Sequence, residues 1–159
     1  MARTTISGMK ELNERLAGLT KQSGEVVKAA LYAGGGKLAD AVRGNLESLE
    51  TMQDGERRQP GEYILTESQK EDLKKSFGVS PIAVKNYVSD IHVGFEGYGR
   101  KKTKKYPKGK ANAMIARATE SGTSFSRKQP FIRPAVNKGK EAVLKSMEEA
   151  AVQKIKEQI

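Results

Sequence analysis

The sequence predicts an α+β fold, in which a small antiparallel sheet of three to four strands is flanked by N-terminal helices and by a long C-terminal helix. Apolar residues recur at helical spacing toward both ends of the chain, whereas a segment in the middle alternates as half-buried strands do. A length of 159 residues suits one domain with its own core. We therefore expect a single domain over 1–159, made of a helical part (7–49), a loop (50–62), a short helix, hairpin and basic loop (63–133) and a C-terminal helix (134–159).

The N-terminal part is predicted to contain two amphipathic helices. Apolar residues repeat every three or four positions across 7–20, where Ser7 is placed to cap the helix, and again from Ser23 to about Leu49. The second pattern contains Gly34-Gly35-Gly36-Lys37, which lacks the G-x-x-x-x-G-K-[ST] frame of a phosphate-binding loop. These glycines indicate a flexible or closely packed point in the helix, such as a kink or a contact with a neighbouring subunit.

A short helix is predicted after the exposed loop. Thr66 and Gln69 have the spacing of a capping box, in which each residue bonds to the backbone of the other. Gly78 is placed to end the helix. These two local signals give a helix from about Glu67 to Phe77.

A β-hairpin is predicted next, because apolar residues alternate with others in two runs separated by Ser89-Asp90, which would form the turn. The alternating apolar residues are Ile82, Val84, Ile91, Val93 and Phe95. His92 is the single histidine and falls on the opposite face of its strand from its two neighbours. We interpret it as a surface residue, because no serine, cysteine or acid partner for catalysis is in view.

Two further elements are predicted in the C-terminal third. Alanine favours a helix in 111–121, but the position before Gly122 favours a strand that pairs with the hairpin, and we predict a strand. From Pro134 onward, apolar residues mark one face of a helix about 24 residues long, or roughly 36 Å. We expect Leu144 and Met147 on that face to contact an adjacent subunit, because one small sheet can hardly cover both amphipathic ends of the chain.

The net charge of +10 is concentrated in the middle of the chain. Residues 100–138 hold 12 basic residues and one acidic residue, and the parts on either side are nearly balanced. Such a patch attracts polyanions, so nucleic acid or an acidic protein surface is the expected partner. The densest part is the loop from Gly97 to Lys110, whose expected DNA-facing residues are Arg100, Lys101, Lys102, Lys104, Lys105, Lys108 and Lys110.

Composition argues against several classes of function. The chain has no cysteine and one histidine, so neither disulfides nor a thiolate or histidine-rich metal site is expected. No paired carboxylates, activated nucleophile or cofactor loop can be recognised, so we expect no catalytic residues, no cofactor and no enzyme activity. No apolar run approaches the roughly 18–20 residues of a membrane span, and the N-terminus lacks a secretory signal, so a cytoplasm-like compartment without membrane contact is expected.

The most distinctive stretch runs from Ala116 to Ala135. It combines a Gly122-Thr123 turn with Pro130, Pro134 and the apolar pair Phe131-Ile132. Glycine permits a positive φ and each proline fixes φ, so the path of this stretch is closely specified. We expect it to orient the C-terminal helix. Glu120 and Arg133 flank the turn and could pair, but we favour two solvated side chains, because an exposed ion pair contributes only about 0–1 kcal/mol.

The motif E-S-G-T followed by P-F-I-R-P-A and a charged helix resembles a family of tail components of long-tailed bacteriophages, whose members act as neck or tail-completion proteins. The segment 66–77 adds weaker support, and Ser121 departs from the family, which usually has a bulky residue there. The resemblance also favours a strand at 111–121. It rests on Glu120, Gly122, Thr123, Pro130, Phe131, Arg133, Pro134 and Ala135.

The resemblance implies a structural virion protein of the head–tail junction, made in the host bacterial cytoplasm. Such a protein would form a homo-oligomeric ring, with six subunits expected, around the DNA channel, between head-completion and tail-tube proteins. Neck ring, tail terminator and head–tail joining protein all remain open. The competing hypothesis is a freestanding nucleic-acid-binding protein whose loop from Arg100 to Lys110 grips phosphates.

Overall fold

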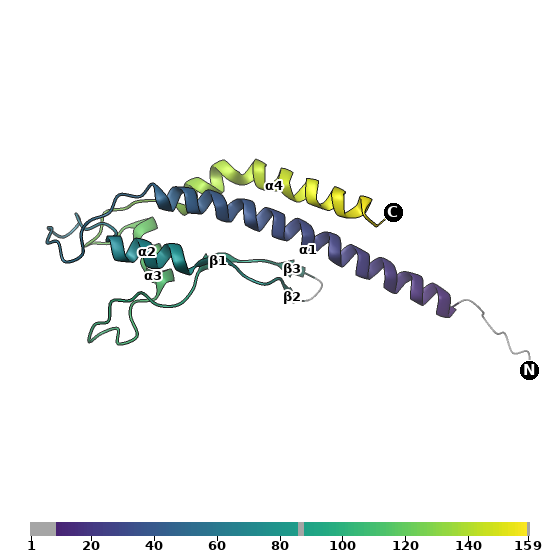
Figure 1. The fold of residues 1–159 in the computed structure, drawn as a ribbon, viewed down its shortest axis with the longest axis horizontal. Helices are drawn as coiled ribbons and strands as arrows, with labels where there is room; N and C mark the ends of the chain where they lie inside the picture. The colour runs from purple at the N-terminus through teal and green to yellow at the C-terminus, as the bar shows by residue number, and fades with distance from the viewer. Residues whose placement is uncertain (1–8, 86–87, 159) are drawn as a thin grey trace, which may run out of the picture.

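The computed structural model describes residues 9–85 and 88–158, and within them the chain has an α+β fold, as predicted (Figure 1). Two long helices lie side by side, and two short helices and a β-ribbon pack against one of them. In chain order the elements are α1 (Met9–Glu47), α2 (Glu67–Ser76), β1 (Phe77–Val79), β2 (Ala83–Lys85), β3 (Val88–Asp90), β4 (Val93–Phe95), α3 (Asn112–Ser121) and α4 (Ile132–Lys156).

α1 is one continuous helix of 39 residues, so the prediction of two N-terminal helices was wrong. Glycine costs about 1 kcal/mol in a helix interior relative to alanine, but it does not end a helix that elongates on both sides of it. Gly18, Gly24 and the three glycines from Gly34 are therefore all accommodated. The predicted cap at Ser7 lies outside the described residues.

α4 runs antiparallel to α1, and the predicted C-terminal helix is confirmed with a length of 25 residues. Near the start of α4, Asn45 Nδ2 donates a hydrogen bond to Phe131 O (2.9 Å), whereas near its end Gln158 Nε2 donates to Gln22 O (3.5 Å). These two contacts lie at opposite ends of the helix pair. Residues 9–21 of α1 continue beyond the end of α4 (Figure 1).

The strands form a narrow ribbon of two antiparallel pairs, β1 with β4 and β2 with β3. The ladder is interrupted at Ser80-Pro81, where Ser80 N–H donates to His92 O (2.8 Å) and its hydroxyl accepts the N–H of His92 (3.0 Å). Proline cannot donate to a ladder, which explains the break. The predicted antiparallel hairpin is thus present, but in two short pieces.

The roles predicted for Ser89-Asp90, as the hairpin turn, and for Gly78, as the end of the short helix, were both wrong. Ser89-Asp90 is not a turn, because both residues lie in β3, where Ser89 pairs with Val84. Gly78 does not end α2 but lies in β1, opposite Gly94. In both cases tertiary pairing overrides a local preference for turns or helix ends.

Residues 112–121 form helix α3, so the strand predicted for 111–121 was wrong. Ile115 and Ala116 on one face of α3 are almost completely buried, at 5% and 2% exposure. The alanines favour a helix, and a helix also buries one apolar face of this segment. Both effects therefore favour a helix over a strand here. Gly122 terminates α3, and its N–H donates to Ala118 O (2.8 Å).

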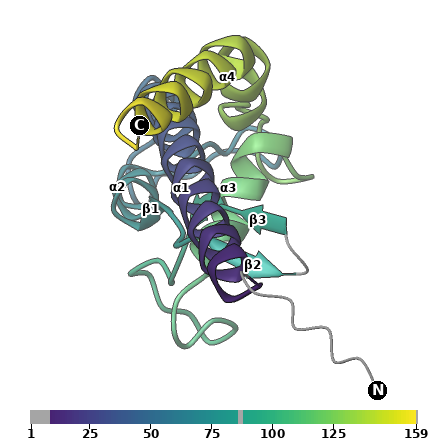
Figure 2. The same ribbon diagram turned by 90° about the vertical axis from the view of Figure 1, so that its right-hand side faces the viewer.

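The core lies at one end of the elongated molecule, where the short helices and the ribbon meet the C-terminal half of α1 (Figures 1 and 2). Leu46, Leu73 and Phe131 are its largest fully buried side chains. Among the described residues of α4, only Ala135 is fully buried. Away from this end, few other elements cover α1 and α4. The buried core residues are Ala39, Val42, Leu46, Leu65, Leu73, Phe77, Ile115, Ala116, Phe131 and Ala135.

Candidate functional site

The carboxylate of Glu120, in the last turn of α3, caps the start of α4. Its Oε2 accepts hydrogen bonds from the backbone N–H groups of Phe131 (2.7 Å) and Ile132 (2.8 Å), and its Oε1 accepts one from Arg133 (3.0 Å). The first N–H groups of a helix have no acceptor inside that helix. Glu120 supplies the acceptor from a different helix.

Pro134 completes this arrangement. It is the third residue of α4 and has no backbone N–H, so it leaves no donor to be satisfied there. Phe131, Ile132 and Arg133 therefore carry all the free N–H groups of this first turn, and each bonds to Glu120. Pro130 lies exposed just before Phe131, the cap residue of α4.

The same bonds keep Glu120 ionised. Burial alone would raise the pKa of this carboxyl, whose side chain is only 9% exposed. The three backbone donors and the charge of Arg133 outweigh burial and lower the pKa of Glu120 below its ordinary value of 4.5. The Glu120–Arg133 ion pair itself is weak, because Arg133 Nε lies 3.9 Å from Oε1 and the arginine side chain is 68% exposed.

The other motif residues fix the chain between α3 and α4. Gly122 has a φ of +73°, in the left-handed region that the sequence predicted for it. The hydroxyl of Thr123 accepts the backbone N–H of Ser126 (3.0 Å). Phe131 is 1% exposed, and its ring meets that of Phe95 edge-on at 6.0 Å between centroids. The motif therefore fixes the start of α4 and, through Phe131, packs it against the core.

The basic loop is clasped at its base. Tyr98 and Ala111 form an isolated antiparallel bridge, and Gly99 N–H donates to Lys110 O (2.8 Å). Gly109 has a φ of +96°, and a Cβ at this position would lie 1.9 Å from Gly99 O. A larger residue at Gly109 would therefore have to open the clasp.

Arg100, the first of the residues expected to face DNA, makes ion pairs within the described part of the chain, unlike the lysines of the loop. Its guanidinium pairs with Glu71 (2.8 Å) and Asp72 (2.9 Å), and its backbone N–H donates to Asp72 (2.8 Å). The hydrogen bond to Glu71 is the main cause of the raised pKa of Arg100. Arg100 therefore anchors the loop to α2.

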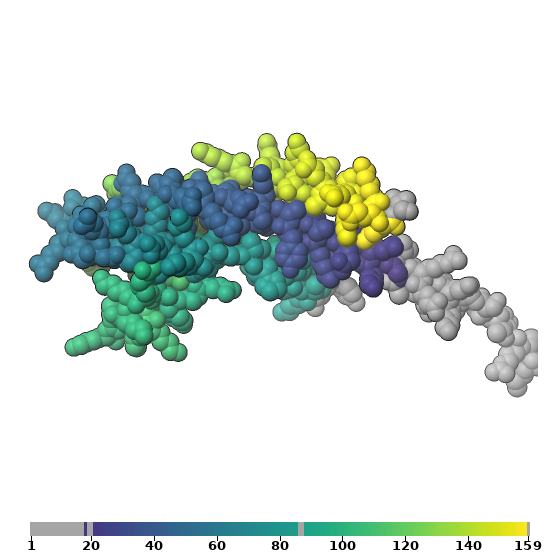
Figure 3. Space-filling model, viewed as in Figure 1, coloured from purple at the N-terminus to yellow at the C-terminus, as the bar shows by residue number. Residues whose placement is uncertain are grey.

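The lysines of the loop lie differently. All are exposed except Lys110, which is half-buried, and within the described residues none of them makes an ion pair. The segment that carries them projects from the body of the molecule (Figure 3). Their charge is thus available to an anionic partner. These lysines are Lys101, Lys102, Lys104, Lys105, Lys108 and Lys110.

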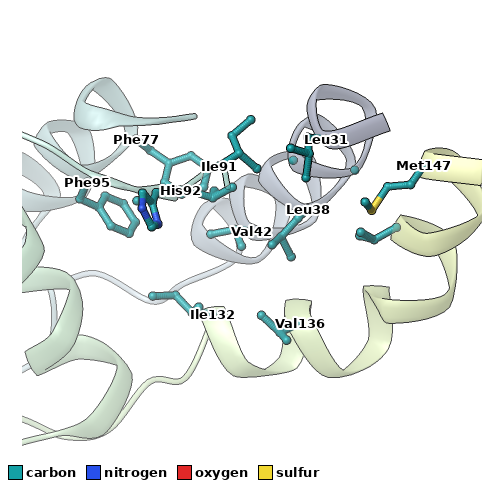
Figure 4. Close-up of a pocket in the computed structure, with 15 residues that line it drawn as sticks. Leu31, Leu38, Val42, Phe77, Ile91, His92, Phe95, Ile132, Val136 and Met147 are labelled. Carbon is teal, nitrogen blue, oxygen red and sulfur yellow. The ribbon is translucent and has the colours of Figure 1, made fainter. Parts of the chain in front are cut away.

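An apolar groove with a volume of about 370 Å³ lies between α1, α4 and the ribbon (Figure 4). Two glycines of α1 border it. A Cβ on Gly34 would lie 2.5 Å from Met147 Cγ, and one on Gly35 would lie 3.3 Å from Ile91 Cδ1. The predicted close packing at these glycines is therefore present, and the neighbours are α4 and the ribbon of the same chain.

The two residues predicted for a subunit interface lie in different surroundings. Met147 packs against Gly34 of its own chain, whereas Leu144 is 56% exposed. Val152 and Ile155 of α4 are also exposed, at 44% and 45%. Apolar surface therefore remains uncovered along α4.

The described part of the chain contains no group of three or more histidine, aspartate or glutamate side chains placed to hold a metal ion. His92 is exposed, and its Nε2 lies 4.0 Å from the carboxylate of Asp90, which is exposed as well. None of the described helices combines the length and the apolar character that a membrane span requires.

Comparisons with known proteins found no match among family models, curated proteins or solved structures.

Proposed function

We propose that the protein is a structural component of the head–tail junction of a tailed bacteriophage and that it works by assembling into a ring around the DNA channel. The phage assignment rests on the resemblance of the stretch from Glu120 to Ala135. The observation that supports assembly is the apolar surface left on α4, where Leu144, Val152 and Ile155 are each 44–56% exposed.

The occupant of this surface is a second copy of the chain. Residues 139–159 contain four basic and four acidic residues, so the surface around Leu144 carries little net charge and does not repel another copy. The basic loop, in contrast, would repel its counterpart. An interface between α4 and a different face of the neighbour is heterologous, and such an interface closes into a ring when the rotation between subunits permits.

The loop lysines suit the lining of a DNA channel. They carry no ion pairs within the described residues and project from the body, so each subunit would offer a few non-specific contacts to phosphates. Such contacts are sequence-independent and weaken with salt, which fits a channel through which DNA must pass.

The experiment is to measure the mass and symmetry of Leu144→Asp beside the wild type, by light scattering and negative-stain imaging. The wild type should form closed sixfold rings, alone or with tail-tube protein, and Leu144→Asp should remain monomeric with unchanged helical content. Gln153→Asp is the matched control, since it adds the same charge on the opposite side of α4 and should still form rings.

A wild type that stays monomeric at high concentration, with and without tail components, would exclude the ring. If such a monomer still bound duplex DNA in a salt-dependent manner, the freestanding nucleic-acid-binding protein would become the better proposal.

A further inference from the structure

A pocket with a volume of about 320 Å³ lies between the basic loop and the helices α2 and α3. This volume falls at the lower end of the range of small-ligand sites, about 300–1,000 Å³. Most of its lining surface is apolar, although most of the residues that line it are polar or charged. The residues that matter for its chemistry are Ile115, Tyr106, Lys101, Lys105, Lys110 and Asp72.

The pocket combines an apolar interior with cations. Ile115 is 5% exposed and Tyr106 is half-buried, so these two side chains supply the apolar and aromatic surface. Lys101, Lys105 and Lys110 also line the pocket. Lys105 Nζ lies 5.7 Å from the centroid of the Tyr106 ring, so a cation stands directly beside the aromatic face.

The acidic groups near the pocket are already engaged. Both carboxylate oxygens of Asp72 accept hydrogen bonds from Arg100. Asp54 bonds to the hydroxyl and the backbone N–H of Ser68, at 2.7 Å and 3.2 Å. The hydrogen bond from Ser68 is the main cause of the lowered pKa of Asp54, to which the charge of Lys101 also contributes. The three lysines therefore leave this pocket with an excess of positive charge.

We propose that this pocket binds one unpaired nucleotide of a single-stranded nucleic acid. The base lies against Tyr106 and Ile115, and the adjacent phosphates bind Lys101, Lys105 and Lys110. Stacking on an aromatic ring together with cations along the backbone is the usual chemistry of single-strand binding. A free phosphate would leave the apolar interior unused, and a base inside a duplex cannot enter because it is paired and stacked.

This inference goes beyond the proposed ring, since the pocket lies within one subunit and requires no neighbour. The test is fluorescence anisotropy with a labelled oligothymidylate and, separately, a labelled duplex of the same length, both at fixed salt. Measurements on wild type and on the Leu144→Asp variant separate nucleotide binding from assembly. Failure of one proposal would therefore not be mistaken for failure of the other.

Two comparisons between variants test whether this pocket is the binding site for the single strand. Tyr106→Ala should weaken single-strand binding by about tenfold or more while changing duplex binding little, because base stacking on one aromatic residue is lost. Lys101→Gln with Lys105→Gln should weaken single-strand binding more than Lys102→Gln with Lys108→Gln, although both pairs remove the same charge. Circular dichroism checks that each variant is folded.

Three results would overturn the proposal. The first is equal loss of single-strand binding in the two lysine pairs, which would indicate bulk electrostatic attraction. The second is unchanged single-strand binding in Tyr106→Ala. The third is competition by inorganic phosphate as effective as that by thymidine monophosphate, which would reduce the pocket to a simple anion site.

Discussion

Glu120 Oε2 lies 2.7 Å from the backbone nitrogen of Phe131, and through this bond the end of α3 fixes the start of α4. Phe131 is at the same time one of the most buried side chains of the core. The direction of α4 is therefore set at a point where a buried carboxylate and a buried ring belong to the same short stretch.

Replacing Glu120 by alanine should lower the free energy of unfolding by roughly 3 kcal/mol, because three backbone N–H groups lose a charged acceptor. Glu120→Gln should cost less, since its one remaining carbonyl oxygen can still accept. Denaturant titration measures both values. The control is Arg133→Gln, which removes only the exposed ion pair and should cost under about 1 kcal/mol; an equal cost in Arg133→Gln and Glu120→Ala would contradict the capping role.

Acidification should weaken the fold through the same group. Since the pKa of Glu120 is lowered in the folded state, its ionised form stabilises the protein fully above about pH 4.5, and this contribution is lost as the pH falls through the folded-state pKa. The difference in unfolding free energy between wild type and Glu120→Gln should therefore shrink as the pH falls from 7 toward 3. A difference that stays constant with pH would show that ionisation of Glu120 is unimportant.

Phe131→Ala should cost about 3–5 kcal/mol, as expected for a large side chain removed from a packed core. Phe125→Ala offers a matched control six residues earlier in the sequence, as Phe125 is 64% exposed. That substitution should change stability by less than about 0.5 kcal/mol. Thermal melts of the two variants test whether Phe131 is part of the core. Equal melting temperatures would contradict that placement.

Short-range signals in the sequence predicted their structures well. The capping box of α2 is present, with Thr66 Oγ1 accepting from Gln69 N (3.3 Å) and Gln69 Oε1 accepting from Thr66 N (3.1 Å). All its atoms lie within one helical turn, so spacing alone specifies it. The positive φ of Gly122 was predictable for a similar reason, because its neighbours strongly indicate a turn.

Features that depend on distant residues were not predictable in this way. The sequence favoured a solvated Glu120, whereas its carboxylate is buried and accepts hydrogen bonds from backbone N–H groups, whose availability depends on where α4 begins. Met147 looked like interface surface because its partner is Gly34, a residue without a side chain to reveal the contact. The clasp between Gly99 and Gly109 is also a contact between backbones, and the spacing of apolar residues cannot predict such a contact.

Substitutions at two glycines of α1 should have opposite effects. Gly34→Val should destabilise the protein by about 1–3 kcal/mol, because the new side chain would overlap Met147 and push α4 away. Gly36→Ala should stabilise it by up to about 1 kcal/mol, since a Cβ there meets nothing within 4 Å and alanine favours helix. Unfolding titrations of both variants decide the matter, and equal stabilisation by both would exclude the close approach of α4 at Gly34.

Changing Lys101, Lys102, Lys104 and Lys105 together to glutamine should preserve folding and oligomeric state but flatten the salt dependence of duplex DNA binding. Each lost phosphate contact removes about 0.9 from the slope of log affinity against log salt. The control is a variant with the same charge change in exposed lysines elsewhere, which should retain most of the slope. Equal slopes in loop variant and wild type would show that the loop does not contact DNA. The control positions are Lys37, Lys75, Lys85 and Lys128.

Because the core occupies only one end of the helix pair, resistance to local opening should fall along α1 from its C-terminal half toward its N-terminus. Amide hydrogens near Val42 and Leu46 can exchange only when the packed end opens, whereas those near Val27 belong to a part of the helix that is half-buried at most. The less protected end is also where α4 keeps exposed apolar residues such as Val152 and Ile155. A bound neighbour would therefore slow exchange most where the isolated subunit exchanges fastest, and deuterium uptake would map the contact without any substitution.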